Sequence, residues 1–391
     1  MMRLYRDDKM NRKKVCFLTQ EYKRGATWTY CHQLARILNN QGEWETHIIS
    51  TNRNYESSDK TEDSFVSLVE TSNSRYFYSR NYWKKSNKLV KQLKPDVIQG
   101  NMNILSSFGI KTKIPIVETV HTTFSREKRG VAKLPLRNLS WVERRVRLLF
   151  PLLKYIEKRV LRRASHLIAV SQVIKKELIE NYSIEEEKIT VIPNGVDSKV
   201  HYRTDEKIYT KKDKELVLGF LGRMTAGKGA HLIFPIIKEI KKKIPDVKLL
   251  MAGDDLNSRK KILHQINNLE LNENIIDYGY IYDNHKKNTF FSSIDLLLLP
   301  SSHEGMSLVL LEAMACQTPV LTTPEAETFD HDETLIIAHR SVDDFASKAI
   351  DFYNNQKLID KIQKKSREVA EKLSWQKTTN QTKEVFEKLL G

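Results

Sequence analysis

Residues 216–241 read LVLGFLGRMTAGKGAHLIFPIIKEIK, and this stretch decides the fold class. It begins with a short apolar run, residues 216–221, and continues through a loop that contains three glycines. An amphipathic segment follows from His231. A buried strand that leads through a glycine loop directly into a helix is the first half of a βαβ unit. The stretch therefore predicts a parallel sheet covered by helices.

The same alternation extends in both directions along the chain. Short apolar runs predict strands, and amphipathic stretches, among them residues 28–38, 231–241 and 306–315, predict helices between most of them. The strands predicted before a polar stretch at residues 198–214 are residues 15–18, 46–50, 96–99, 114–119, 166–170 and 189–192. The later predicted strands are residues 247–252, 275–278, 296–299 and 319–322, and residues 342–390 are predicted to be helical throughout. We therefore expect two mostly parallel sheets with a boundary near the polar stretch.

Composition indicates an ordinary globular chain. It has 391 residues, and a hydrophobic content of 40% is ample for the cores of two or three domains. The three cysteines, Cys16, Cys31 and Cys316, lack the spacing of metal ligands, which predicts reduced, buried thiols in the cytosol. We find no run close to the roughly 18–20 apolar residues that a membrane-spanning helix needs. We expect a cytoplasmic protein that is soluble or peripheral on the inner face of the membrane.

The positive charge is unevenly spread. Residues 126–163 contain 13 lysines or arginines and three glutamates, so they carry +10 of the net charge of +16. A localised basic patch indicates an anionic partner surface, either membrane lipid or nucleic acid. Apolar residues recur within the patch at spacings of three and four, which predicts one helical stripe interrupted by Pro151. The stripe consists of Leu139, Val142, Val146, Leu149, Leu153, Ile156 and Val160. We expect this region to dock on an anionic membrane, and the alternative is that the stripe packs on its own domain.

The glycine loop carries two cations. Arg223 and Lys228 flank the point where the backbone can approach a ligand closely and where a helix presents free N–H groups to an anion. Arginine suits bidentate contacts with an oxyanion, whereas lysine acts as a point charge. The loop is not a phosphate-binding Walker A motif, because Gly229 follows the lysine in place of Ser or Thr. The alternative is a plain strand-to-helix turn with two solvated cations.

Two carboxylates follow a very apolar strand. Glu304 comes directly after residues 296–300, and Glu312 lies eight positions later, about two turns along a helix. Open α/β sheets bind ligands at the carboxyl ends of their strands, and both carboxylates are predicted to lie near that edge. Carboxylates are good acceptors for pairs of sugar hydroxyls, and the helix that opens after Gly305 could hold a phosphate. The alternative is an acidic helix cap plus one partly buried glutamate.

Together these residues resemble a known enzyme family. Arg223 and Lys228, Glu304 and Glu312, and the stretch VIPNGVD at residues 191–197 are similar to family 4 retaining glycosyltransferases (glycosyl transferases group 1) of the GT-B fold. The resemblance covers nearly the whole chain, roughly residues 14–390, in the right order. It implies an α/β protein with two Rossmann-like domains and a cleft between them.

The resemblance also implies three domain ranges. Residues 1–200 are expected to form an N-terminal, acceptor-side Rossmann-like domain. Residues 201–372 are expected to form a C-terminal Rossmann-like domain that binds a nucleotide sugar. Residues 373–391 are expected to form a C-terminal helix that packs back on the N-terminal domain.

The resemblance assigns roles in the C-terminal half. Arg223 and Lys228 would bind the donor diphosphate, Glu304 would bind hydroxyls of the transferred sugar, and Glu312 would bind the ribose. Backbone N–H groups would contact sugar and phosphate, and two further residues match the place where the family holds the base. The first set is Gly305, Met306 and Ser307, and the second is Gly279 and Tyr280. For Tyr280 a packed aromatic side chain is an equal alternative.

In the N-terminal half the resemblance is carried by two positions. His121 follows the apolar stretch IVETV, residues 116–120. By the resemblance it would face the cleft close to the donor sugar, which makes it a candidate catalytic residue in addition to Arg223, Lys228 and Glu304. Gly25 fits the glycine loop that follows the first strand, although the family often has two glycines there and this chain has one. The family's glycines and glutamate after the strand at 319–322 are replaced by TPEAE, residues 323–327.

The expected activity follows from the resemblance. We expect a retaining transferase that moves a hexose-type sugar from a nucleotide-diphosphate donor to a hydroxyl of a glycan or lipid-linked acceptor. Asp330 and Asp332 match an Asp-x-Asp metal pattern, but so short a match is weak, and we expect neither metal nor cofactor. The alternatives are a GT-B sugar-nucleotide epimerase and, from another class, a basic nucleic-acid-binding protein, although no aromatic-basic stacking motif is present.

Overall fold

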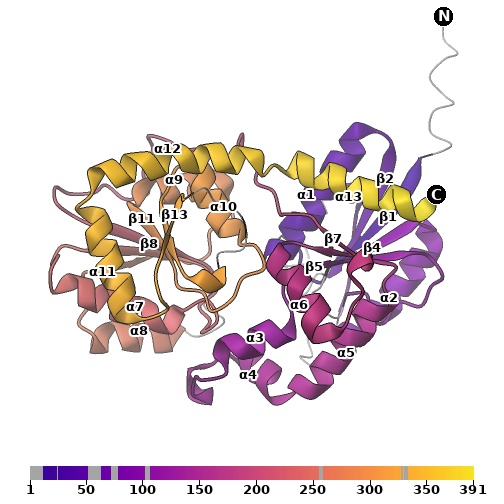
Figure 1. Cartoon of the computed structure of the whole chain (residues 1–391), viewed down its shortest axis with the longest axis horizontal. Coiled ribbons are helices and arrows are strands. Elements are labelled where there is room, and N and C mark those ends of the chain that lie inside the picture. Colours follow the sequence, from indigo (N-terminus) through magenta and orange to yellow (C-terminus); the bar gives the residue numbers. More distant parts are fainter. Residues whose placement is uncertain are drawn as a thin grey trace, which may run out of the picture. The chain divides into compact units, whose positions relative to one another are not determined.

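The computed structural model describes residues 12–23, 25–51, 63–71, 78–101, 106–254, 259–326, 329 and 333–391. The chain divides into two compact units, each with its own parallel sheet (Figure 1). Unit 1 lies within residues 1–123, 154–194 and 375–391, and unit 2 lies within residues 124–153 and 195–374. This division differs from the sequence-based boundary at residue 200, because residues 124–153 belong to unit 2.

Unit 1 contains a seven-stranded parallel sheet with the order β3-β2-β1-β4-β5-β6-β7. The connections β1-α1-β2 and β3-α2-β4 run in opposite directions along the sheet, so right-handed crossovers place α1 and α2 on opposite faces. The strands are β1 (Lys13–Leu18), β2 (Trp44–Thr51), β3 (Val66–Val69), β4 (Val97–Asn101), β5 (Ile116–Val120), β6 (His166–Ala169) and β7 (Ile189–Val191). The helices are α1 (Gly25–Gln41), α2 (Tyr78–Leu93), most of α5 (Phe150–Arg163), α6 (Gln172–Tyr182) and α13 (Trp375–Leu390).

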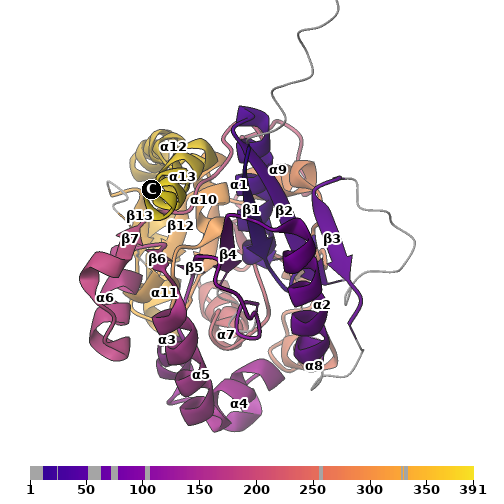
Figure 2. The same cartoon turned by 90° about the vertical axis from the view of Figure 1, so that its right-hand side faces the viewer.

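The helix α13 belongs to unit 1 although it comes last in the sequence (Figures 1 and 2). It packs on α1, and its Phe386 ring lies 5.5 Å from the ring of Trp44. At its other end Trp375 meets Tyr30 edge to face at 5.9 Å. All four aromatic side chains are buried, so α13 closes the core on this side of unit 1.

Unit 2 contains a six-stranded parallel sheet with the order β10-β9-β8-β11-β12-β13. The chain moves outward from β8 in one direction and then returns to the other side, which is the doubly wound order of nucleotide-binding folds. The strands are β8 (Val217–Leu221), β9 (Lys248–Ala252), β10 (Ile275–Asp277), β11 (Leu296–Leu299), β12 (Val320–Thr322) and β13 (Leu335–Ile337). The helices are α3 (Phe124–Val131), α4 (Trp141–Leu148), α7 (Ala230–Lys241), α8 (Arg259–Asn268), α9 (Asn284–Ser293), α10 (Leu308–Ala315), α11 (Val342–Tyr353) and α12 (Gln356–Lys372).

The fold class predicted from the sequence is confirmed. Each predicted strand corresponds to an observed strand, with bounds that differ by up to two residues. Two short strands, β3 and β13, were not predicted. Residues 342–390, predicted to be helical, form the three helices α11, α12 and α13. The three cysteines are buried, as expected. Within the described ranges no helix is both long enough and apolar enough to cross a membrane.

The predicted apolar stripe at residues 139–160 requires a correction. The segment forms two helices, α4 and α5, and Pro151 stands in the first turn of α5, where proline is tolerated. Most of the stripe is turned inward, since four of its seven residues are buried: Leu139, Val146, Leu153 and Val160. Six large apolar side chains are exposed in this region, and only Leu149 among them belongs to the stripe. They are Leu136, Trp141, Leu148, Leu149, Leu152 and Tyr155.

Candidate active site

Three loops meet at the carboxyl edge of the sheet of unit 2, where parallel sheets bind ligands. Gly222 N, after β8, donates to Ala252 O at 3.0 Å, and Gly253 N, after β9, donates to Gly279 O at 2.8 Å. A Cβ atom at Gly253 would lie 1.9 Å from Gly222 O, so only glycine allows this approach. The predicted base-binding residues Gly279 and Tyr280 therefore belong to the same edge as the loop that carries Arg223 and Lys228.

The glycine loop brings Lys228 against Glu304. Its Nζ lies 2.6 Å from Oε1 of Glu304, which is on the loop after β11. A Cβ atom at Gly229 would come 2.3 Å from the carbonyl oxygen of Pro300, so glycine is needed where the two loops touch. The loops are also joined by backbone, because Ser302 N donates to Gly227 O at 2.8 Å. Two residues 76 positions apart in the sequence thus form one ion pair at the sheet edge.

Glu304 is an ionised acceptor. Its side chain is 7% exposed, and Oε1 also accepts a 2.7 Å hydrogen bond from Ser301 Oγ. Burial alone raises the pKa of Glu304, but the Lys228 ammonium and the hydrogen bonds from Lys228 and Ser301 together outweigh burial. The pKa of Glu304 therefore lies below its ordinary value, and the carboxylate is charged at neutral pH.

Glu312 forms a second buried ion pair. It stands in the middle of α10, and Lys287 Nζ from α9 contacts its two carboxylate oxygens at 2.8 and 3.0 Å. His201 Nε2 lies 3.8 Å from Oε1 of Glu312. Burial raises the pKa of Glu312, yet Lys287 and His201 outweigh it and lower the pKa below the ordinary value. Lys287 and His201 were not predicted from the sequence, because neither stands in a recognisable motif.

The other predicted residues of this half lie at the same edge. Gly305, Met306 and Ser307 are buried between Glu304 and α10. Ser307 caps α10, and its side chain accepts from Leu310 N. Arg223 is exposed on the loop after β8. The structure thus places Arg223, Lys228, Gly279, Tyr280, Glu304 and residues 305–307 on segments that follow strands of this sheet, and Glu312 on α10, the helix that follows one of those segments.

Two ionisable groups beside the Lys228–Glu304 pair have shifted pKa values and were not predicted. Burial lowers the pKa of His303 to about 4, helped by Lys228, Arg126 and Arg340, so its imidazole is neutral at pH 7. Burial raises the pKa of Glu127, on α3, to about 7, and Glu143 contributes to the rise, whereas Arg223 opposes it. Shifted ionisable groups of this kind gather at functional sites.

His121 and Gly25 belong to unit 1, and both lie at the carboxyl ends of its strands. His121 follows β5, its Nε2 lies 3.4 Å from Oδ1 of Asn101 at the end of β4, and its ring packs edge to face on Tyr30 at 5.0 Å. Burial lowers the pKa of His121 to about 4, so the ring is neutral. Gly25 begins α1 with φ +80, a left-handed conformation that favours glycine.

The candidate metal residues Asp330 and Asp332, and Glu327 of the TPEAE stretch, lie outside the described residues. Glu325 of that stretch is described, and its carbonyl oxygen accepts from Arg126 at 3.3 Å and from Glu304 N at 3.3 Å. Glu325 therefore supports the Glu304 loop through its backbone. Among the described residues no group of three or more His, Cys, Asp or Glu is arranged to hold a metal ion.

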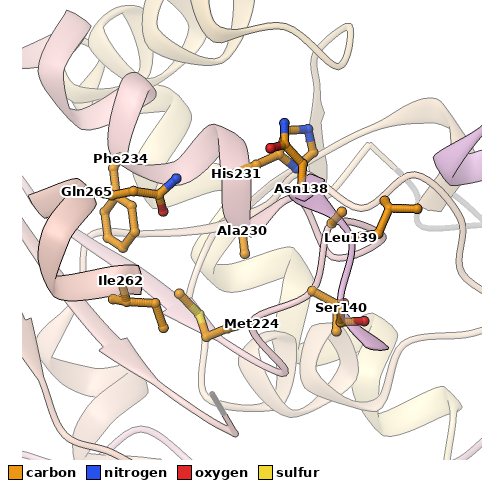
Figure 3. Close-up of a pocket in the computed structure, with 11 residues that line it drawn as sticks. Asn138, Leu139, Ser140, Met224, Ala230, His231, Phe234, Ile262 and Gln265 are labelled. Carbon is orange, nitrogen blue, oxygen red and sulfur yellow. The ribbon is translucent and has the colours of Figure 1, made fainter. Parts of the chain in front are cut away.

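A small cavity of about 180 Å³ lies behind the glycine loop in unit 2 (Figure 3). Its apolar wall includes Phe234 and Ile262, and its polar lining includes His231, whose pKa burial lowers to about 4. Its other lining residues are Asn138, Leu139, Ser140, Met224, Thr225, Ala226, Ala230 and Gln265. Lys228, Glu304 and Glu312 do not line it, so this cavity is distinct from the two ion pairs.

The two-sheet architecture is that of the GT-B enzymes. Sucrose-phosphate synthase from Thermosynechococcus elongatus has a TM-score of 0.81 with 17% identity over 97% of this chain and 99% of that protein. The Anabaena protein HepE, solved in complex with UDP-glucose, has a TM-score of 0.70 with 16% identity over 96% of this chain and 99% of its own. At these identities the similarity shows the fold.

Sequence comparison gives the family. Residues 27–200 match Glycosyltransferase Family 4, and residues 202–369 match Glycosyl transferases group 1. An uncharacterized glycosyltransferase of Methanocaldococcus jannaschii is 26% identical over 244 residues, which are 60% of this chain and 63% of that relative. The chain thus matches less than two thirds of this relative's length. The protein belongs to the group 1 glycosyltransferases, as its sequence motifs predicted.

Proposed function

We propose that the protein is a retaining glycosyltransferase that moves a hexose-type sugar from a nucleotide-diphosphate donor to a hydroxyl of a glycan or lipid-linked acceptor. The observation that carries the proposal is the Lys228–Glu304 pair, in which a cation and a buried, ionised acceptor stand 2.6 Å apart at the sheet edge. A sugar diphosphate needs both groups side by side, because its phosphate is anionic and its sugar presents hydroxyl donors. The HepE complex with UDP-glucose supports a nucleotide sugar as the donor.

The chemistry follows from where charge develops. Cleavage between the anomeric carbon and the phosphate oxygen leaves negative charge on the diphosphate and an oxocarbenium-like sugar. Lys228 and Arg223 are the cations on the loop that would receive the diphosphate, so they would stabilise charge that grows in the transition state. We propose that the acceptor hydroxyl attacks the same face of the sugar and that the departing phosphate oxygen takes its proton. Retention itself rests on the family resemblance.

Glu312 serves binding rather than bond cleavage in this proposal. Lys287 neutralises its charge and contacts both oxygens, so the carboxylate is held in one orientation for a diol such as a ribose. Gly279 and Tyr280 are proposed to hold the base. In unit 1, His121 is proposed to contact the donor sugar as a neutral imidazole. Gly25 is proposed to let the loop backbone approach the donor closely.

A panel of nucleotide sugars tests the function. We expect one of them to raise the melting temperature and to be hydrolysed slowly without an acceptor, with release of the nucleoside diphosphate. Release of an epimerised sugar as the main product would favour the epimerase alternative. Failure of the whole panel in both assays would contradict the donor proposal.

We also propose that the protein is peripheral on an anionic membrane and that the docking surface is the exposed apolar set on α4 and the start of α5: Trp141, Leu148, Leu149 and Leu152. Six of the nine large apolar side chains that are exposed among the described residues lie between residues 136 and 155, within the segment of greatest positive charge. Apolar insertion together with basic residues, each worth about 1 kcal/mol near an anionic leaflet, suffices for peripheral binding.

Flotation with vesicles tests this surface. Leu148, 64% exposed, and Leu152, 55% exposed, are changed to Asp, and the matched control is Leu263→Asp on α8, where the leucine is 46% exposed. We expect wild type and the control to float with phosphatidylglycerol vesicles at low salt. The double variant should remain unbound at the bottom of the gradient. Arg144 is a poor target, because its Nε donates to the carbonyl oxygens of Leu136 and Leu139 and so supports the local fold.

The vesicle composition separates the alternatives. Binding should need the anionic lipid and should fall as salt is raised. A protein that ignores these vesicles but shifts DNA or RNA at physiological salt would favour the nucleic-acid alternative.

A further inference from the structure

The first turn of α4 forms a capping box. Ser140 is the N-cap, and its Oγ accepts from Glu143 N at 3.4 Å. In return Oε2 of Glu143 accepts from Ser140 N and from Ser140 Oγ, both at 2.8 Å. This motif accounts for one oxygen of the Glu143 carboxylate and leaves the other for a contact outside α4.

The second oxygen of Glu143 binds the glycine loop. Gly227 N donates to Oε1 at 2.6 Å, and Ala226 N approaches Oε2 at 3.4 Å. The next three N–H groups of the loop are bonded within the loop itself: Lys228 N to Thr225 Oγ1, Gly229 N to Ala226 O and Ala230 N to Thr225 O. The N–H groups that Glu143 accepts are therefore those that the loop directs away from itself, immediately before Lys228.

The segment that carries Glu143 also touches the Glu304 loop. Arg126 Nη2 donates to the carbonyl oxygen of Glu304 at 3.1 Å. A Cβ atom at Gly130 would lie 2.3 Å from Ser302 Oγ and 2.5 Å from His303 Nδ1, so α3 approaches that loop closely at this glycine. Apolar packing adds to these contacts through Val131, Leu134, Leu139 and Ala226. Residues 124–153 thus hold both loops that supply the Lys228–Glu304 pair.

We propose that Glu143 is a positioning residue for Lys228, an inference that rests on the proposed use of a diphosphate donor. A loop with glycines at 222, 227 and 229 has many unfolded conformations, and a carboxylate that accepts two of its N–H groups selects one of them. Lys228 is bonded directly to Gly227, so the direction of its side chain follows the peptide that Glu143 holds. A cation already in place costs less to engage when the donor arrives.

The opposite reading makes Glu143 a competitor of phosphate. Loop N–H groups at the start of a helix bind anions, and a carboxylate on them could occupy a place that the donor needs. The two readings predict opposite effects of removing the carboxylate. A positioning residue makes donor binding weaker when it is lost, whereas a competitor makes it stronger.

The experiment compares Glu143→Ala and Glu143→Gln with Ser140→Ala, which weakens the cap of α4 but leaves the contact with Gly227. Hydrogen exchange of residues 222–229 is measured without ligand, and binding of UDP, GDP and ADP is measured by calorimetry. We expect Glu143→Ala to exchange faster in this loop and to bind the preferred nucleotide about tenfold more weakly, the effect of losing a charge-assisted hydrogen bond. Glu143→Gln keeps one acceptor and should lie in between, and Ser140→Ala should match wild type within about twofold.

Two results would overturn the positioning role. One is wild-type exchange in residues 222–229 of Glu143→Ala, and the other is tighter nucleotide binding by that variant. The exchange measurement needs no ligand, so it decides the role of Glu143 even if none of the three nucleotides binds wild type. If none of the three nucleotides binds wild type, that result counts against the proposed function.

Discussion

Unit 2 contains two buried glutamate–lysine pairs that differ in how their lysines are held. Glu304 and Glu312 are both almost inaccessible, at 7% and 6% exposure, and both have pKa values below the ordinary range because a lysine outweighs the cost of burial. Lys228 reaches one oxygen of Glu304 from a glycine loop, whereas Lys287 reaches both oxygens of Glu312 from a helix.

The two pairs stand on different kinds of element, and this difference points to different roles. Glu312 and Lys287 stand on α10 and α9, so their geometry is fixed by two helices that pack in the fold. Glu304 and Lys228 stand on loops, and their geometry depends on glycines and on the segment 124–153. Binding and catalytic residues are often placed on loops that a rigid scaffold positions. We therefore expect the Lys228–Glu304 pair to act on the reacting bond. We expect the Lys287–Glu312 pair to bind a part of the donor that stays unchanged.

The largest expected effect is at Lys228. Lys228→Ala removes the cation proposed to face the leaving diphosphate and leaves Glu304 buried without its partner, so kcat should fall by roughly 10²–10³. Arg223→Ala should act in the same direction and by a similar factor. Steady-state kinetics with the nucleotide sugar found by the panel measure the effect, and Lys238→Ala, an exposed lysine on α7, is the control. A loss of less than tenfold for both variants would contradict the charge-stabilising role.

The second prediction separates the two glutamates. Glu304→Ala should lower kcat more than it raises KM, because Glu304 is proposed to hold the reacting sugar. Glu312→Ala should raise the Kd for donor about tenfold, the cost of a lost hydrogen bond to a charged group, with kcat nearly unchanged. Calorimetry gives the Kd and steady-state rates give kcat. Equal effects of both variants on kcat and Kd would remove the distinction.

A smaller effect is expected from pH. The pKa values of Glu304 and Glu312 are depressed from 4.5 in the folded state, so folding favours their charged forms. Their contribution to the free energy of unfolding is complete above pH 4.5 and is lost as the pH falls through the folded-state pKa values. Urea unfolding from pH 6 down to pH 3 should show a steeper loss for wild type than for Glu312→Gln. Identical slopes would show that the Lys287 pair does not stabilise the fold.

The smallest effect is expected from a chelator. Because Lys228 and Arg223 are proposed to supply the charge that the diphosphate requires, excess EDTA should leave the rate of transfer within about twofold of the untreated enzyme. The rate is measured before and after dialysis against EDTA. Complete loss that Mn²⁺ or Mg²⁺ restores would instead support Asp330 and Asp332 as metal ligands.

The sequence predicted both members of the Lys228–Glu304 pair but only Glu312 of the second pair. Glu304, Glu312 and Lys228 stand in motifs that follow apolar strands and resemble those of the family, so the sequence could single them out. Lys287 and His201 come from segments rich in polar residues, where a solvated face and a buried partner look alike. The capping box around Glu143 is visible at residues 140–143, but nothing local tells that its second oxygen binds a loop 84 residues later.

The fold was predictable because most strands and helices have a clear apolar pattern. The features that were not predicted have physical explanations. The unpredicted strands β3 and β13 have four and three residues, too few for an alternating or apolar run to stand out. The stripe at residues 139–160 shows that a spacing of three and four identifies a helix face without telling where it points. Leu139 and Val146 proved to be the inner face, and Leu148 and Leu152 the outer one.

The place of α13 has a consequence for how the chain is made. Residues 375–390 pack against α1, and Trp44 and Tyr30 meet their aromatic partners Phe386 and Trp375 only when this helix is present. A ribosome synthesises all of unit 2 before it reaches residue 375. Domains usually finish folding in the order of synthesis, but here unit 1 begins first and is completed last. Until α13 is made, Tyr30 and Trp44 lack these partners, and a chaperone that binds nascent chains would meet this uncovered surface.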